Sequence, residues 1–282
     1  MSSILQRVSK DFSSLPRQLQ KVATFILAHP NDVAFLTLES TAEKSDVSTT
    51  TVLRFARRMG YAGFTDFQKQ IQSDMRVQQG TLVDKFNRLY TSVSRDELLF
   101  NTFSRDIQNI NRTMMEMPLD QLKRAVELIV NAEHVYINGL RESHALAHYA
   151  FTRLMTIRPY VSLLARAETE MPEPLLTLGA NDVCIHFLFM RYTRKSIEIL
   201  TELRRSKATI ILITSPDYSA LADLADIILP CYVEGNALKN TSAAPISLIN
   251  YIANAVVDYD YEKSLRFLAQ VEEILIRNNI LC

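Results

Sequence analysis

The sequence has few cysteines and lacks a long apolar run. Its three cysteines, Cys184, Cys231 and Cys282, form no CxxC pair and stand in or near apolar runs, so we expect buried thiols rather than a metal site or disulfides. No apolar run approaches about eighteen residues, and no basic-then-apolar leader opens the chain. These absences predict a cytoplasmic protein that does not enter a membrane, and no cofactor is predicted.

The chain also lacks a net charge, because 31 Lys and Arg balance 31 Asp and Glu over 282 residues. The charge is nevertheless uneven: residues 1–80 hold ten basic against seven acidic side chains, a net of +3, which leaves −3 for the rest. With 48% hydrophobic and 22% charged residues, the chain is long enough for two soluble domains. The basic excess lies in the N-terminal part, but it is too small to identify a nucleic-acid partner.

One short stretch, residues 39–67, carries the pattern of two helices joined by a tight turn. Its second half has apolar side chains three and four positions apart, which make one side of a helix apolar: Val52, Phe55, Ala56 and Met59. Ser48 is placed to cap the start of this helix, and Gly60 to end it in the left-handed conformation. The first helix is expected to be capped by Ser40 and to run to Lys44.

The opposite side of the second helix is polar and basic. At about 100° per residue, the positions on this side or at its edges are Thr49, Thr50, Leu53, Arg54, Arg57 and Arg58. Arginine can donate two hydrogen bonds to a guanine edge, and hydroxyl groups contact bases or phosphates, so this face with Ser48 fits the major groove of DNA. A solvated helix in an ordinary bundle fits the same pattern equally well.

The run VSTTTVLRFARRMGYAGFTDFQ resembles the pattern V-S-x-A-T-V-x-R-F-x-R-x-L-G-x-x-G-F-x-x-F of the RpiR-type family of bacterial helix-turn-helix regulators. The matching positions are Val47, Ser48, Thr51, Val52, Arg54, Phe55, Gly60, Gly63 and Phe64. Thr50 replaces the usual alanine and adds a hydroxyl group on the exposed side. The resemblance implies an N-terminal DNA-binding domain followed by a sugar isomerase (SIS) domain that senses a phosphosugar.

The rest of the chain divides into a helical part and an α/β part. Amphipathic helices are expected over residues 13–29, from near residue 32 and over residues 66–75, so residues 1–77 form an all-α helix-turn-helix domain. Residues 78–95 are interpreted as a linker in which Leu82, Phe86 and Leu89 are spaced for a helix. Residues 96–282 form the second domain.

Short apolar runs alternate with helical segments in the second domain, which indicates a parallel sheet with crossover helices. The expected strands are 134–138, 160–164, 183–189, 208–214 and 227–229. The expected helices are 96–116, 120–131, 142–155, 173–178, 193–205, 219–224, 242–257 and 260–278. The segment ILITSPDYSALADLADIIL resembles the corresponding SIS segment, which implies a flavodoxin-like five-stranded sheet with its first and third strands adjacent.

A ligand of such a sheet binds beyond the carboxyl ends of the strands at the switch point, where the loops run into helix N-termini. In phosphosugar-binding members the loop after the third strand resembles S-x-S-G-x-T. Here Leu188 and Met190 stand at the serine positions and Arg191 at the glycine position, and only Thr193 matches. An unchanged phosphosugar pocket is therefore not expected, because two hydroxyl donors and the backbone freedom of glycine are lost.

Three interpretations of this pocket stay open. In the first, the pocket is vestigial and the domain is an oligomerisation scaffold. In the second, Arg141 and Arg191 converge on another anion such as a carboxylate, with Leu188 and Met190 packing an apolar portion. In the third, the two arginines hold a phosphosugar. Ser143 matches the first-loop serine of the family, and Ser242, which opens a C-terminal helix, is a further candidate.

Four other side chains are candidates for a functional role. His144 and His148 lie four apart on one helical face, a spacing that can hold a metal, yet no Cys, Asp or Glu completes a motif, so packing or an interface is expected. His186 is expected to be a satisfied core histidine. Glu142 is a candidate base only if the domain is an isomerase.

The sequence as a whole predicts a transcriptional regulator without catalytic activity. We expect it to bind double-stranded operator DNA and to form a homodimer or homotetramer. Its SIS domain is expected either to bind a small effector, such as a phosphosugar or a carboxylate, or to serve for assembly. Two-fold symmetry and paired half-sites are expected, because one recognition helix touches too few bases. The alternative is a sugar-phosphate isomerase-like enzyme with an appended helical domain.

Overall fold

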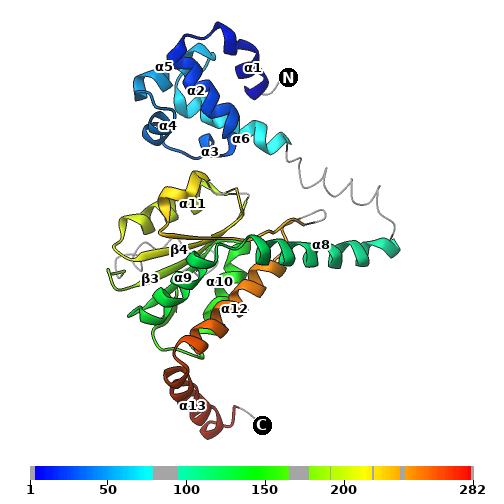
Figure 1. The fold of residues 1–282 in the computed structure, drawn as a ribbon, viewed down its shortest axis with the longest axis vertical. Helices are drawn as coiled ribbons and strands as arrows, with labels where there is room; N and C mark the ends of the chain where they lie inside the picture. The colour runs from blue at the N-terminus through cyan, green and yellow to red at the C-terminus, as the bar shows by residue number, and fades with distance from the viewer. Residues whose placement is uncertain are drawn as a thin grey trace. The chain divides into compact units, whose positions relative to one another are not determined.

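The computed structural model describes residues 4–78, 95–164, 178–190, 192–217, 219–235 and 239–280. The chain divides into two compact units, one helical and one built on a sheet, and each is described by itself (Figure 1). The predicted linker with Leu82, Phe86 and Leu89 lies almost wholly outside the described residues. The domain boundaries at 77 and 96 stay a prediction.

The helical unit is built on a small apolar core. Its helices are α1 (Ile4–Asp11), η1 (Phe12–Ser14, a 3-10 helix), α2 (Arg17–Ala28), α3 (Pro30–Val33), α4 (Leu38–Lys44), α5 (Thr49–Arg58) and α6 (Phe64–Gln78). Phe55 of α5 and Phe67 of α6 are fully buried and pack edge to face, with ring centroids 5.6 Å apart. These two rings fix α5 against the rest of the unit.

Two predicted helix starts in this unit are wrong. The helix predicted over residues 13–29 begins only at Arg17, directly after Pro16, because a proline holds the preceding Leu15 in an extended conformation. The first helix of the helix-turn-helix begins at Leu38, and Thr37, not Ser40, caps it: the Ser40 amide donates to Thr37 Oγ1 at 3.1 Å. Helix α1 was not predicted.

The second unit holds one parallel sheet. Its strands are β1 (Val135–Gly139), β2 (Val161–Leu163), β3 (Val183–Leu188), β4 (Thr209–Thr214) and β5 (Ile227–Pro230), in the order β2-β1-β3-β4-β5. The flavodoxin-like order with β1 beside β3 is therefore confirmed. The helices are α8 (Arg95–Glu116), α9 (Leu119–Asn131), α10 (Glu142–Met155), α11 (Arg194–Arg205), η3 (Ser219–Leu224, a 3-10 helix), α12 (Ala243–Tyr259) and α13 (Tyr261–Arg277).

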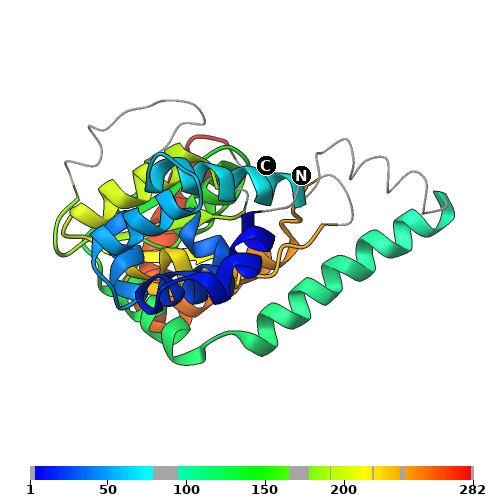
Figure 2. The same ribbon diagram turned by 90° about the horizontal axis from the view of Figure 1, so that it is seen from above.

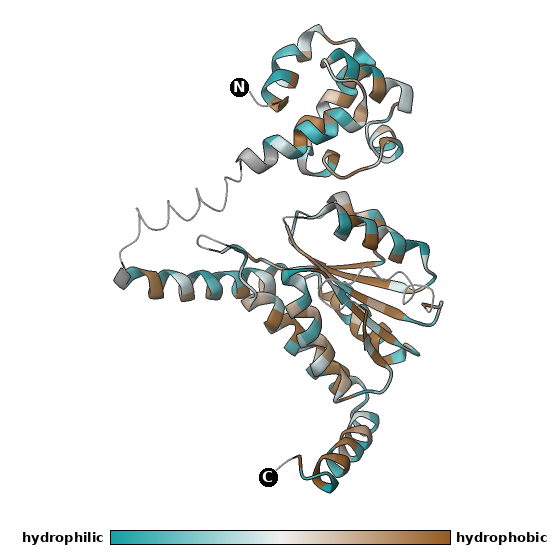
Figure 3. Ribbon diagram, turned by 180° about the vertical axis from the view of Figure 1, so that it is seen from behind, coloured by the Kyte–Doolittle hydropathy of each residue, from teal (hydrophilic) through white to brown (hydrophobic). Residues whose placement is uncertain are grey.

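Helices cover both faces of this sheet. One core lies between the sheet and α9, α10 and α12, whereas α11 lies on the opposite face (Figure 1). Strands buried on both faces read as continuous apolar runs, and in Figure 3 they are coloured as hydrophobic almost throughout. The predicted helix at 173–178 lies outside the described residues apart from Leu178.

Two helices of this unit extend beyond its packed core. In Figure 2, α8 projects past the sheet and its covering helices, and in Figure 1, α13 leaves the unit at the end of α12. Cys184 and Cys231 are free and buried, as predicted, and burial raises the pKa of each thiol to about 12; Cys282 lies outside the described residues. None of the helices in the described ranges combines the length and apolar character that a membrane span needs.

Candidate functional sites

The turn between α4 and α5 is held by local hydrogen bonds. Asp46 adopts a left-handed φ of 52°, and the amide of Val47 donates to the carbonyl of Ala42 at 3.0 Å. The Lys21 ammonium donates to the Asp46 carboxylate and lowers its pKa. Together these contacts set the direction in which α5 leaves the turn.

Helix α5 is capped at both ends by the residues predicted from the sequence. Ser48 Oγ accepts from the Thr51 amide at 3.3 Å and lies 2.9 Å from Thr51 Oγ1. Gly60 has φ +87°, the left-handed conformation that ends a helix. Arg7 of α1 adds a contact that the sequence did not predict, since its guanidinium donates to the carbonyl of Met59 at 2.8 Å and to Tyr61 Oη at 3.3 Å.

The polar face of α5 is open to solvent. Thr50, Arg54, Arg57 and Arg58 are exposed, Thr49 is half-buried, and Leu53 is half-buried against the core, so it lies at the edge of this face. Within the described residues, the three guanidinium groups form no hydrogen bond or ion pair with a protein group. The arginines are therefore available to an anionic or hydrogen-bonding partner.

The second candidate site lies at the carboxyl ends of β1 and β3. These strands pair in parallel with Gly139 opposite Phe187, so the loops that follow them leave the sheet side by side. A Cβ atom at Gly139 would lie 2.5 Å from the carbonyl oxygen of Ser143, and only glycine allows α10 to begin this close to β1. Arg141, just before α10, is exposed and has a φ of 56°, a strained conformation for this residue type.

The predicted effector residues lie in these two loops or at the helix starts that follow them, except for Ser242, which precedes α12. Ser143 is half-buried in the first turn of α10, and Thr193 Oγ1 accepts from the Ser196 amide at 3.1 Å, so it caps α11. The carbonyl of Met190 accepts from the Asn240 side chain. Arg191 lies outside the described residues. Ser242 is half-buried at the start of α12 and forms no side-chain cap.

Several buried polar atoms near this edge were not predicted as site groups. Ser215 Oγ directly follows β4, His144 Nδ1 lies in the first turn of α10, and neither has a hydrogen-bond partner among the described residues. Buried polar groups without partners are rare, and each calls for an explanation such as a bound ligand or water. The only sequence signal for Ser215 is its position at the end of an apolar strand.

His186 is only partly satisfied, which corrects the prediction. It pairs across β3 and β1 with Asn138, whose Nδ2 lies 3.0 Å from His186 Nδ1, but its Nε2 has no partner within the described ranges. Burial lowers the pKa of His186 to about 4, so the ring is neutral at pH 7. The strand pairing brings these two polar side chains together, and the sequence alone did not indicate it.

Glu142 and the pair His144 and His148 were the remaining candidates for a base and for a metal site. Glu142 is paired with Lys239 at 3.6 Å. The rings of His144 and His148 lie 6.5 Å apart, and in the part of the chain that the structure describes no group of three or more His, Cys, Asp or Glu side chains is arranged to hold a metal ion.

Two family models match the chain at the positions that the two units occupy. The helix-turn-helix domain of the rpiR family matches residues 2–78, and the SIS domain matches residues 128–256. An HTH-type transcriptional regulator of Caldanaerobacter subterraneus subsp. tengcongensis is 24% identical over 291 residues, covering 99% of both chains. The similarity to this relative therefore runs through both domains of the chain.

Solved structures show the same folds. The NanR protein of Vibrio vulnificus, complexed with ManNAc-6P, matches 98% of both chains with a TM-score of 0.64 and 20% identity. The sugar isomerase domain of an RpiR transcription factor from Sphaerobacter thermophilus has a TM-score of 0.59 and 23% identity, and the match covers 63% of this chain and 99% of that one. The chain belongs to the RpiR-type helix-turn-helix transcriptional regulators, with an N-terminal helix-turn-helix domain followed by a SIS domain.

Proposed function

We propose that this regulator reads operator DNA with the polar face of α5. The contact residues in this proposal are Ser48, Thr49, Thr50, Leu53, Arg54, Arg57 and Arg58. One observation carries it: the three arginines of this face are exposed and have no protein partner among the described residues. Such guanidinium groups can bind guanine edges in the major groove and backbone phosphates.

The operator in this proposal is an inverted repeat bound by a homodimer or homotetramer in the cytoplasm. A single helix of ten residues, α5, spans only about 15 Å and reaches few base edges. Two copies related by a two-fold axis read half-sites about one helical turn apart, roughly 34 Å, or a multiple of that distance. Symmetry of the protein then appears as symmetry of the DNA sequence.

We propose that the SIS domain binds a small anionic effector at the carboxyl ends of β1 and β3, rather than catalysing an isomerisation. Two loops there run into the N-termini of α10 and α11, where backbone amides and the helix dipole favour an anion. The strained Arg141 and the unpartnered atoms of His144 and Ser215 support a polar ligand. The ManNAc-6P of NanR makes a phosphosugar one candidate, and the apolar Leu188 and Met190 make a carboxylate the other.

Selection from genomic DNA tests the DNA-binding proposal. Purified protein is incubated with fragmented DNA of its source organism, and the retained fragments are sequenced. We expect a few sites that share an inverted repeat. Uniform, salt-sensitive retention would instead indicate backbone electrostatics without base recognition, and the α5 proposal would be rejected.

The effector proposal is tested on the operator found in this way. Phosphosugars, including ManNAc-6P, and small carboxylates are screened for a change in operator affinity. We expect Arg141→Ser to abolish the response while operator affinity without effector stays the same. Arg153→Ser, at the other end of α10 and also exposed, is the matched control and should respond like the wild type. A normal response from Arg141→Ser would remove this residue from the site.

A further inference from the structure

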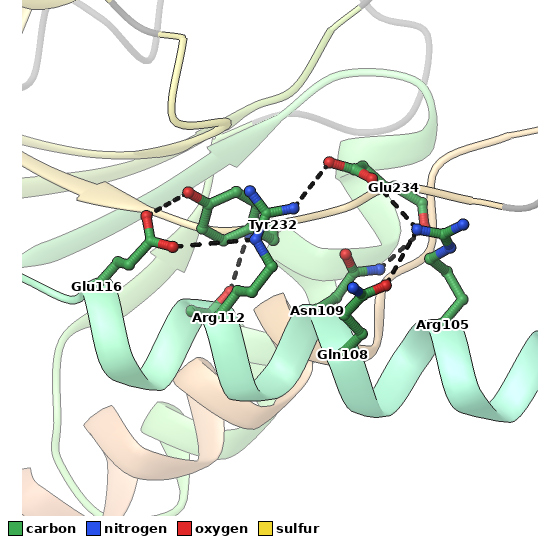
Figure 4. Close-up of polar contacts among 8 residues, drawn as sticks. Arg105, Gln108, Asn109, Arg112, Glu116, Tyr232 and Glu234 are labelled. Carbon is green, nitrogen blue, oxygen red and sulfur yellow. Dashed lines mark hydrogen bonds and ion pairs between the residues drawn. The ribbon is translucent and has the colours of Figure 1, made fainter.

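One side of α8, which we call the tied side, is hydrogen-bonded to residues 232–234, the segment that follows β5. The side-chain amide of Asn109 donates to the carbonyl of Glu234 at 2.9 Å (Figure 4). Thr113 Oγ1 accepts from the backbone amide of Tyr232 at 2.9 Å. The Arg112 guanidinium stacks 3.7 Å from the centroid of the Tyr232 ring and donates to Glu234 Oε1 at 3.1 Å. Because Asn109 and Thr113 are buried, these bonds fix the rotation of α8 about its own axis.

A second stripe on α8 is apolar and largely exposed among the residues that the structure describes. Its members repeat at spacings of three and four residues, the a and d positions of a heptad: Phe100, Phe103, Ile107, Ile110 and Met114. Phe100, Phe103, Ile107 and Met114 are 74%, 63%, 57% and 64% exposed. We call these five residues the α8 seam. Ile110 follows Asn109 by one position, and Met114 follows Thr113 in the same way. The seam therefore lies about 100° around the helix from the tied side.

The composition of α8 indicates whether a lipid surface, a nucleic acid or another helix packs on the seam. The helix holds three arginines against four carboxylates, so it lacks the basic excess that attracts an anionic lipid surface or a nucleic acid. Two of the arginines, Arg105 and Arg112, also lie within 4 Å of the Glu234 carboxylate. The a and d spacing over these fifteen residues, about two heptads, is the spacing with which one helix packs against another.

We propose that the α8 seam pairs with the α8 seam of a second copy of this chain. Because the seam is apolar throughout, two copies of it can pack on each other about a two-fold axis, and Ile107 lies at its midpoint. The 22 residues of α8 extend about 33 Å, so the helix pair forms the apolar centre of a larger contact. This inference rests on the proposed assembly of two chains for operator binding, and it names the surface that pairs them.

Sedimentation of the full chain tests the surface. We expect the wild type to sediment as a dimer or tetramer, and Phe103→Glu combined with Ile107→Glu to halve that mass or raise the dissociation constant at least tenfold. Met115→Glu, an equally apolar and 81% exposed position outside the seam, should keep the wild-type mass. A monomeric wild type, or a double variant with unchanged mass, would overturn the proposal.

Cross-linking gives a second measurement that does not depend on a destabilising charge. In a Cys282→Ser chain, Ile107→Cys should form a covalent dimer under mild oxidation whichever way the two helices run, because its two copies meet at the midpoint. Met115→Cys is the control and should stay unlinked. Equal linking of both variants would refute the α8 pairing. If the chain is dimeric through another surface, the operator proposal survives and only the α8 pairing is lost.

Discussion

Replacing Arg54 by alanine is expected to weaken operator binding without changing the stability of the helical unit. The side chain is exposed in the middle of α5 and has no partner within residues 4–78, so its removal should alter the free energy of unfolding by less than about 0.5 kcal/mol. A lost base or phosphate contact costs about 1 to 3 kcal/mol. On a two-fold operator both copies lose it, so the total is about 2 to 6 kcal/mol, or roughly 30-fold to 10⁴-fold in Kd.

Fluorescence anisotropy at fixed salt, on the operator and on a scrambled duplex, measures this loss. If Arg54 contacts a base, its loss brings the affinity for the operator closer to the affinity for the scrambled duplex. If it contacts a phosphate, its loss lowers both affinities and reduces the salt slope by about one for each contact. Arg124→Ala in α9 removes the same charge from an exposed helical position in the other unit and should leave both affinities unchanged. Wild-type affinity in Arg54→Ala would refute the role assigned to the α5 face.

Three further predictions concern the local structures that hold the sites. Ser48→Ala removes the cap of α5 and should lower the free energy of unfolding of the helical unit by about 0.5 to 2 kcal/mol in urea titrations; no loss would show that the cap is dispensable. Gly139→Ala puts a Cβ atom 2.5 Å from the Ser143 carbonyl, so it should destabilise the sheet unit by about 1 to 3 kcal/mol and abolish the effector response, and a fully responsive variant would contradict the close approach. The pKa of His186 is about 4 in the folded chain and about 6.5 in the unfolded chain, so its protonation does not affect the free energy of unfolding above about pH 6.5. As the pH drops to 4, this free energy falls by about 3 kcal/mol, because the unfolded chain binds the proton first. Unfolding of the wild type and of His186→Gln across this range should differ in slope, and equal slopes would refute burial of a neutral ring.

Local signals predicted the limits of α5 well. The hydroxyl of Ser48 and the left-handed φ of Gly60 act within one turn of their own positions, so the limits of α5 follow from nearby residues. The first helix of the motif was placed too late because Thr37 and Ser40 are both capping types. The choice between them depends on where Leu36 and Ala42 are buried.

Helix α1 shows why other elements were missed. Its eight residues carry only two buried apolar side chains, Ile4 and Val8, too few for a periodic signal. The helix is stabilised by packing and by a hydrogen bond from the Ile4 amide to Asp74, seventy positions away. A contact between residues this far apart in the sequence depends on the tertiary structure and cannot be inferred from neighbouring residues.

The sequence by itself determined the family, the two fold classes, the capped helix α5 and the departure of Leu188 and Met190 from the serine pattern of the family. These features are carried by short motifs and by the period of apolar residues, which are local. Tertiary structure alone decided that Asn138 meets His186 across two strands and that Glu234 and Tyr232 hold α8. These contacts join residues 48 to 125 positions apart, and only the packed sheet brings them within hydrogen-bonding distance.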